Sequence, residues 1–341
     1  MARKPGLPLA LSLLAACFGA ASAGPARAQE AAGHVVVFEQ PVLRGIEDNF
    51  HVPKAEHHYP RERTFNVLLW QPNPERADGE LVPARWKAGD MTGFYPGEPI
   101  AEHQAAFRDA EGASTVQIQD DTVGAYLNTR DLPASTPYQK MMVTPEFKPK
   151  EAIFPFKQPG TELEAQLELQ VPVAKDENRP GSYTYVVSDM LFRDAKTGLQ
   201  LTLGVRLFHH KPGRAPATLS PEEMRRTEIG KFDVPGQTFQ IGNLIAPGSR
   251  VFTVMPGSTT FQTGTWTGWR PFRYAVTWEN FRDALHDLRE KGEGFHGSED
   301  PADYKLINWH LNAEVKFGSA PAELGWSMRH ARLEVAPERM N

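Results

Sequence analysis

A strict two-residue alternation is the feature that most constrains the fold of this chain. Between residues 161 and 171, apolar residues alternate with glutamate or glutamine at every second position. The apolar set is Leu163, Ala165, Leu167, Leu169 and Val171, and the polar set is Glu162, Glu164, Gln166, Glu168 and Gln170. Successive side chains of a β-strand point to opposite faces of its sheet. We therefore predict a strand with one face on a core and the other toward water or ligand.

Other short segments show the same apolar or alternating character, and glycine and proline separate them. The chain holds 28 Gly and 29 Pro spread along its length, which leaves little room for long helices. Residues 183–192 and 199–207 flank a turn at 194–198 and predict a hairpin. Further strands are predicted at 35–38, 64–70, 114–118, 138–143, 238–241, 250–255, 259–263, 272–276, 305–317 and 326–335. We expect an all-β fold, an antiparallel β-sandwich of the jelly-roll type.

One short helix is predicted near residues 278–290. Thr277 is a good N-cap residue, and Gly292 is a good residue to end a helix. The apolar residues of this segment fall on one stripe, which is typical of a helix that packs against a sheet. They are Phe281, Ala284, Leu285 and Leu288. A second, shorter helix is predicted at 221–226.

The first 28 residues are predicted to be a secretory signal peptide. Basic residues at positions 3 and 4 precede an apolar run at 7–18, and Ala-x-Ala sites end at Ala23 and Ala28. We therefore expect a secreted or periplasmic protein. Residues 14–17 also resemble a lipobox, which leaves open a lipoprotein anchored through Cys17. No later apolar stretch approaches the ~20 residues that a membrane-spanning helix needs, so we expect no transmembrane segment.

Loss of the signal peptide changes both the charge and the cysteine content. It removes Arg3, Lys4 and Arg27 but no acidic residue, which lowers the formal net charge from −5 to −8. An acidic chain without a dense basic run argues against nucleic acid as a partner. Cys17 is the only cysteine, so the mature chain has no disulfide and no thiol nucleophile, and a hydrophobic core must stabilise the fold.

The domain organisation has two interpretations. Residues 151–341 are predicted to form a β-sandwich domain, whereas residues 29–150 are richer in proline and irregular segments. This N-terminal β-rich region is either a separate domain or part of the same sandwich, because single β domains of more than ~200 residues are common. The oligomeric state stays open.

Two segments near the C-terminus resemble a known fold family. Residues 308–318 (Asn-Trp-His-Leu-Asn-Ala-Glu-Val-Lys-Phe-Gly) and 323–335 (Glu-Leu-Gly-Trp-Ser-Met-Arg-His-Ala-Arg-Leu-Glu-Val) are similar to the closing strand pair of concanavalin A-like jelly-roll proteins. That fold occurs in secreted lectins, glycoside hydrolases and polysaccharide lyases. The resemblance is confined to this strand pair, and it implies a carbohydrate ligand more than a particular reaction.

Carbohydrate recognition needs flat apolar rings for the C–H faces of sugars and polar groups for their hydroxyls. Trp266, Trp269 and Trp326 lie among glycine, threonine and serine residues and are candidate substrate-binding residues. Asn312 is a fourth candidate, because its amide can hydrogen-bond a hydroxyl group. The competing interpretation of each tryptophan is ordinary packing in or near a core.

The best candidates for catalysis lie on the strand predicted at 309–317. Its alternation places His310, Asn312 and Glu314 on the polar face. Glu314 and His310 are candidate catalytic residues, because a carboxyl group or an imidazole can transfer a proton at a glycosidic oxygen. Glycosidases need a second carboxylate, for which Glu168 is a candidate. The alternative is an ordinary polar face in contact with solvent.

Two classes of function remain open at this point. The first is a secreted or periplasmic carbohydrate-active protein that binds a polysaccharide, either without catalysis or as a glycoside hydrolase or lyase. The second is a non-catalytic structural or interaction protein of the cell envelope. No cofactor or metal site is predicted for either class. A concave polar face with aromatic rims favours the first class, and a convex face ringed by lysine and glutamate favours the second.

Overall fold

The structure is a computed structural model of the 341-residue chain. It describes residues 34–40, 65–72, 81–83, 95–96, 104–108, 115–119, 121–128, 139–147, 149, 151–176, 183–210, 227–232, 238–317 and 322–339. The predictions for the signal peptide and for the short helix at 221–226 lie outside these residues. No helix in the described ranges is long and apolar enough to cross a bilayer.

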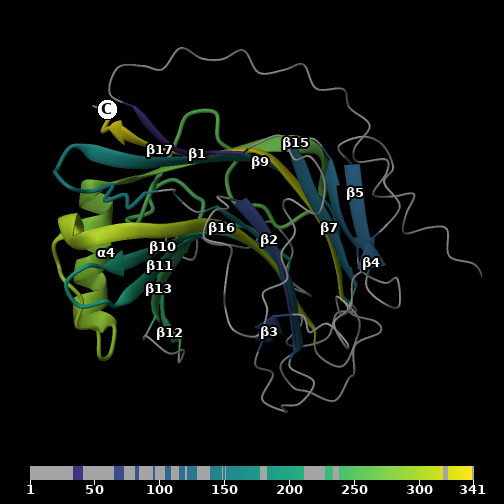
Figure 1. Cartoon of the computed structure of the whole chain (residues 1–341), viewed down its shortest axis with the longest axis horizontal. Helices are drawn as coiled ribbons and strands as arrows, with labels where there is room; N and C mark the ends of the chain where they lie inside the picture. The colour runs from purple at the N-terminus through teal and green to yellow at the C-terminus, as the bar shows by residue number, and fades with distance from the viewer. Residues whose placement is uncertain are drawn as a thin grey trace, which may run out of the picture. The chain divides into compact units, whose positions relative to one another are not determined.

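Two β-sheets pack face to face, as expected for an antiparallel β-sandwich, so the all-β prediction is confirmed (Figure 1). Within the described residues, sheet I has the order β14-β15-β9-β17-β7-β6-β5-β4, with β1 also paired to β17, and sheet II has the order β12-β13-β11-β10-β16-β8-β2-β3. The strands of sheet I are β1 (Val35–Glu39), β4 (Tyr95–Pro96), β5 (Gln104–Arg108), β6 (Thr115–Gln119), β7 (Thr122–Asn128), β9 (Thr161–Asp176), β14 (Thr253–Val254), β15 (Trp266–Thr277) and β17 (Ala322–Pro337). The strands of sheet II are β2 (Phe65–Pro72), β3 (Leu81–Pro83), β8 (Gln139–Phe147), β10 (Tyr183–Asp194), β11 (Gln200–His210), β12 (Glu228–Phe232), β13 (Thr238–Leu244) and β16 (Tyr304–Phe317).

The chain passes repeatedly from one sheet to the other, as jelly rolls do. Strand β7 lies beside β17 in sheet I, and β8 lies beside β16 in sheet II. Strands from before and after residue 150 are therefore neighbours in both sheets. The pairings are antiparallel except that between β11 and β13, which is parallel.

The core lies between the sheets, and the predicted alternation accounts for it. Every apolar residue of the 163–171 set is buried. The hairpin of β10 and β11 forms around the predicted turn, where Gly198 has a φ of 79°. Glycine adopts this left-handed conformation without the steric cost that a Cβ brings.

The predicted helix forms as α4 (Trp278–Lys291), and a 3-10 turn, η3 (Pro301–Asp303), precedes β16. The backbone N–H of Asn280 donates to the Thr277 side chain, and the Asn280 side chain accepts from the Thr277 N–H, which is a capping box. The apolar stripe of α4 is buried, and Phe281 packs on the rings of Phe156 and Phe192. The helix therefore closes one end of the core.

The Thr277 cap gives the first testable prediction. Thr277→Ala removes the hydroxyl that satisfies the Asn280 N–H, so we expect the free energy of unfolding to fall by about 1 kcal/mol. Urea unfolding followed by circular dichroism measures this loss. The matched control is Thr267→Ala at an exposed position, which should change the stability by less than about 0.5 kcal/mol. Equal losses in the two variants would show that the cap contributes nothing specific.

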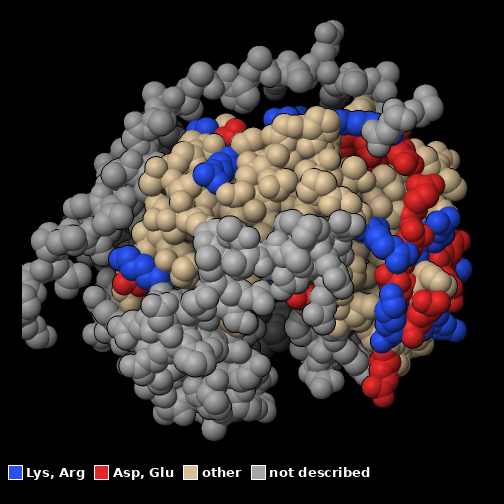
Figure 2. Space-filling view, turned by 180° about the vertical axis from the view of Figure 1, so that it is seen from behind, with Lys and Arg blue, Asp and Glu red and all other residues tan. Residues whose placement is uncertain are grey.

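Sheet II is curved. In Figure 1 its edge strands β12 and β3 both lie below β10 and β16, on the side away from sheet I. The outer face of sheet II therefore lies on the inner side of the bend. Figure 2 shows charged side chains of both signs gathered at the end of the molecule that carries α4. On α4 these charges pair with each other, for example Lys291 with Asp287 at 2.8 Å.

Candidate functional site

The outer face of β10, β11 and β16 carries a group of polar and aromatic side chains. Register brings residues together that are far apart in the sequence: Tyr185 lies opposite Glu314, and Val187 lies opposite Asn312. Residues directly opposite each other in a sheet share a face. His310, Asn312 and Glu314 therefore lie on one face, as the sequence alternation predicted.

Glu314 is held by a tyrosine of the neighbouring strand. The Tyr185 hydroxyl donates a hydrogen bond to Oε2 of Glu314, and the Glu314 residue is only 2% exposed. Burial raises the pKa of the Tyr185 phenol, and the negative charge of Glu314 raises it further. The tyrosine therefore keeps its proton at all physiological pH values and remains a hydrogen-bond donor to the carboxylate.

Asp189 and His310 form a second pair on the same face. The Nε2 atom of His310 lies 3.4 Å from Oδ2 of Asp189, and its Nδ1 atom lies 3.2 Å from the side-chain oxygen of Asn308. Asp189 is 4% exposed, and its Oδ1 atom has no hydrogen-bond donor among the described residues. A carboxylate on one imidazole nitrogen and an amide oxygen on the other fix the orientation of the His310 ring.

Gly204 makes room for the Asp189 carboxylate. It lies opposite Asp189 in the β10–β11 pair. A Cβ at position 204 would lie 2.7 Å from Oδ1 of Asp189, closer than real Cβ contacts. The glycine is needed here because a side chain at this position would displace the carboxylate from His310.

Aromatic rings and a guanidinium group lie next to the Tyr185–Glu314 pair. The rings of Tyr183 and Tyr185 stack with centroids 5.4 Å apart, and the His209 ring meets both edge-on. The guanidinium of Arg206 lies 5.7 Å from the Tyr185 ring centroid. It also forms a 3.0 Å ion pair with Glu228 of the edge strand β12. The tyrosines, His209 and Arg206 are each half-buried, so part of their surface faces solvent.

Strand register separates the two carboxylates of this face. Asp189 lies opposite His310, which is four residues from Glu314 along β16. At ~3.3–3.4 Å per residue, four residues span about 13 Å. The carboxyl groups of retaining glycosidases are ~5–5.5 Å apart, and those of inverting glycosidases are ~6.5–9.5 Å apart. The backbone positions of Asp189 and Glu314 are therefore farther apart than the carboxyl groups of either kind of glycosidase pair.

Glu168 lies on the other side of the molecule. Its strand, β9, belongs to sheet I, and it is on the face that points away from the core. Its carboxylate accepts a 2.7 Å hydrogen bond from Nε of Arg329 and lies 3.5 Å from Nδ1 of His330. The whole core separates Glu168 from Glu314, so we correct the prediction that these two acids act together.

The predicted tryptophans also lie away from Glu314. Trp326 and Trp266 are buried, and the indole N–H of Trp266 donates to the carbonyl of Leu169. Buried rings cannot stack on a ligand, so both residues serve the core. Trp269 is half-buried on the outer face of sheet I, where the Arg329 guanidinium lies 4.4 Å from its ring centroid. Trp269 and Glu168 thus share the neighbour Arg329 on sheet I. His310, Asn312 and Glu314 lie on sheet II.

Tyr185 and Arg206 are members of this face that were not chosen from the sequence. The alternation in 183–192 and 199–207 shows that they point outward, but many other residues of the chain do so too. Only the register of β10 against β11 and β16 places them around Glu314. His310 and Asp189 are metal-ligand types in contact on this face, but no group of three such residues converges here among the residues that the structure describes.

The chain matches no family model and no curated protein. Among solved structures it is similar to the family 11 xylanase from Neocallimastix patriciarum, with 11% identity, a TM-score of 0.33, and coverage of 73% of this chain and 97% of the other. It is also similar to endoglucanase cel12A from Rhodothermus marinus, with 13% identity, a TM-score of 0.30, and coverage of 72% and 99%. A third similar structure is endoglucanase 3 of family GH12 from Trichoderma harzianum, with 9% identity, a TM-score of 0.26, and coverage of 73% and 100%. Values this low indicate neither a shared activity nor a shared site.

Proposed function

We propose that this is an exported carbohydrate-active protein that binds a polysaccharide on the outer face of sheet II. The observation that carries the proposal is the stacked pair Tyr183 and Tyr185 beside His209 and Arg206 on the inner side of the bend. Rings of this kind offer apolar surface to the C–H face of a sugar. The hydroxyl, imidazole and guanidinium groups beside them can hydrogen-bond its hydroxyls.

Glu314 acts in this proposal as a positioning residue. At 2% exposure its carboxylate is not open to a sugar, but it accepts the hydrogen bond of Tyr185 and so fixes the ring that the sugar would contact. Fixing an aromatic side chain before binding lowers the entropy cost of ordering it on the ligand. His310 and Asn312 continue the same face and add an imidazole and an amide.

Binding without hydrolysis is the form of the function that the geometry supports best. In support of this form, Asp189 lies four residues along the sheet from Glu314, a longer backbone spacing than glycosidase pairs use, and Glu168 lies on the other sheet. The curvature of sheet II favours a carbohydrate-binding role over a purely structural role in the envelope, because a chain-like ligand fits the inner side of a bend.

Affinity electrophoresis in gels containing soluble polysaccharides tests this proposal. We expect at least one neutral or uronic acid polymer to retard the wild-type protein. Tyr185→Ala should weaken binding roughly tenfold or more, because a central aromatic contact is lost. Tyr185→Phe and Glu314→Gln should weaken it less, since both keep the ring: the first removes only the donating hydroxyl, and the second removes only the charge of the acceptor. The matched control is Trp269→Ala on sheet I, which should bind as the wild type does.

Two outcomes would contradict the proposal, and a third would extend it to catalysis. Absence of retardation in every polysaccharide, for a protein shown to be folded by circular dichroism, would favour the structural role in the envelope. Equal weakening by Trp269→Ala and Tyr185→Ala would place the binding face elsewhere. Release of reducing ends, abolished in Glu314→Gln while retardation persists, would show that the protein also cleaves its ligand and would restore a catalytic role to Glu314.

A further inference from the structure

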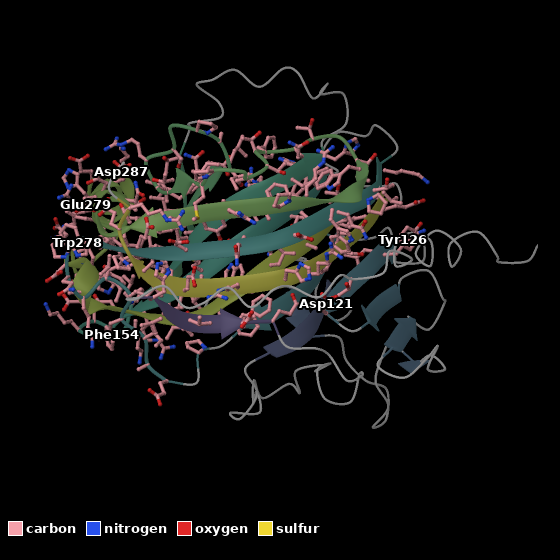
Figure 3. All side chains as sticks on the ribbon, turned by 90° about the horizontal axis from the view of Figure 1, so that it is seen from above. Asp121, Tyr126, Phe154, Trp278, Glu279 and Asp287 are labelled. Atoms are coloured by element: carbon pink, nitrogen blue, oxygen red, sulfur yellow. The ribbon has the colours of Figure 1, made fainter. Side chains whose placement is uncertain are left out.

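A histidine and three carboxylates meet on the outer face of sheet I, where β1, β17 and β9 lie side by side (Figure 3). His34 directly precedes β1. Glu334 of β17 lies opposite Glu164 of β9 in the antiparallel register. One ligand atom from each of these three residues lies within 4.8 Å of the other two. Three strands thus converge on one small set of nitrogen and oxygen ligands.

The carboxylates of this cluster repel each other. Like charges directly opposite each other on neighbouring strands are destabilising. Glu164 and Glu334 have this arrangement, and Glu162 adds a third carboxylate two residues from Glu164 on the same face of β9. Both Glu162 and Glu164 are at most 5% exposed, so solvent screens the repulsion only weakly.

Two arginines offset part of this charge. Arg339 donates to both oxygens of Glu164 at 2.9 and 2.7 Å, and Arg332 donates to Oε2 of Glu334 at 2.8 Å. On the other side of the cluster, Nδ1 of His34 lies 3.7 Å from Oε1 of Glu334. An imidazole nitrogen therefore lies beside the carboxylates of this cluster.

One buried oxygen next to the cluster lacks a hydrogen bond. The Oε1 atom of Glu162 is inaccessible to solvent and accepts no hydrogen bond from any described residue. The Nε atom of Arg339 lies 3.6 Å from it, beyond hydrogen-bond distance. The carboxyl group of Glu162 also hydrogen-bonds that of Glu164, and burial together with this contact raises the pKa of Glu162 to about 7. A buried polar atom without a hydrogen bond is costly, and a cation bound in the cluster would satisfy this oxygen.

We propose that His34, Glu164 and Glu334 bind a divalent transition-metal ion, with Glu162 as a further oxygen ligand. Imidazole together with carboxylates is a donor set that suits zinc and its neighbours, whereas magnesium and calcium favour oxygen alone. The ion would join the segment before β1 to β17 and β9. This site is on the opposite sheet from the proposed polysaccharide-binding face and does not depend on that function.

Isothermal titration of the untagged chain with ZnCl2, and in parallel with CaCl2, tests the proposal. We expect one zinc ion per chain and a melting temperature that rises roughly 5 °C at a hundredfold excess over Kd. His34→Ala and Glu334→Gln should each weaken zinc binding at least tenfold. His286→Ala is the matched control, because His286 also pairs with a glutamate, Glu290, but on the exposed surface of α4. It should leave zinc binding unchanged.

Arg339→Gln separates a metal site from a simple network of ion pairs. Arg339 occupies both oxygens of Glu164, so its removal should tighten zinc binding several-fold by freeing a ligand and removing a positive charge. The proposal is overturned if folded wild-type protein binds no zinc, or if His34→Ala and Glu334→Gln bind zinc as the wild type does. It is also overturned if calcium binds and zinc does not, because His34 would then have no part in the site.

Discussion

Trp309→Ala is expected to lower the free energy of unfolding by about 3–5 kcal/mol. Trp309 is among the largest fully buried side chains, and its ring packs on Phe147 with centroids 4.9 Å apart. The truncation leaves a cavity that the antiparallel strands around it cannot close, because their spacing is fixed by backbone hydrogen bonds.

The indole also takes part in a buried hydrogen-bond chain between the sheets. Its Nε1–H donates to Oγ of Ser188 at 2.7 Å, and Ser188 Oγ lies 2.7 Å from the hydroxyl oxygen of Tyr274 in sheet I. Burial raises the pKa of the Tyr274 phenol, so this hydroxyl stays protonated. Trp309→Phe should cost less than Trp309→Ala, because it keeps most of the apolar volume and loses mainly the bond to Ser188.

Thermal and urea unfolding of both variants measure these losses. At ~2–4 °C per kcal/mol, Trp309→Ala should lower the melting temperature by roughly 6 °C or more. Trp269→Ala is the matched control, since it removes the same side chain from a half-buried surface position and loses only a contact with Arg329. Its expected cost is below about 1 kcal/mol. Similar losses for the two alanine variants would contradict the central place of Trp309 in the core.

Asp194→Asn is expected to cost about 3 kcal/mol at neutral pH. Asp194 ends β10 and is fully buried. Its Oδ1 accepts from the backbone N–H of Lys196, and its Oδ2 accepts from the Thr197 hydroxyl and from the backbone N–H of Ser298. The carboxylate therefore joins the β10–β11 turn to the segment before η3, and an amide at this position would turn its NH2 group toward donors.

The cost of Asp194→Asn should depend on pH. Burial by itself would raise the pKa of the Asp194 carboxyl, but hydrogen bonds from Thr197, Ser298 and Lys196 outweigh it and hold the pKa below the ordinary value of 3.8. A carboxyl group with a lowered folded-state pKa contributes stability that is present above its unfolded pKa and is lost as the pH falls through the folded one. The difference between wild type and variant should thus stay constant from neutral pH to about pH 5 and shrink below about pH 4.

Urea unfolding between pH 7 and pH 3 tests this dependence. Asp283→Asn is the matched control, because Asp283 is half-buried on α4, its side chain is 40% exposed, and it pairs with the neighbouring Arg282. Its effect should be below about 0.5 kcal/mol at every pH. A loss in Asp194→Asn that is the same at pH 3 and pH 7 would show that shape rather than charge is what the turn requires.

Much of the fold could be predicted from the sequence, because the relevant signals are local. The alternation at 161–171 identified the strand and its buried face, and the residues 277–292 contained the cap, the apolar stripe and the end of α4. These predictions succeed because backbone geometry fixes which side chains share a face within one element. The same reasoning placed His310, Asn312 and Glu314 on one face of β16.

The tryptophans show where local patterns are insufficient. Trp266 and Trp269 lie in one short polar context, yet one is buried and the other is half-buried. The register of β15 against β9 shifts between Trp266 and Arg270, so that four residues of β15 span two of β9. The odd spacing of Trp266 and Trp269 puts the two side chains on opposite faces of the strand. Which of these faces meets the core, and where the bulge falls, depends on the partner strand, and the sequence of β15 alone does not contain it.

Sequence by itself thus determined that this chain forms a β-sandwich with one helix, and which residues of each strand share a face. Only the tertiary structure decided which faces meet. Glu168 and Glu314 both lie on polar strand faces, but β9 and β16 belong to different sheets. Strand partners and register depend on contacts between residues far apart in the chain, and these placed Tyr185 against Glu314 and His34 against Glu334. The physical reason is that the backbone geometry of a single strand sets the direction of its side chains. The positions of side chains relative to one another in a site depend on how several strands pair.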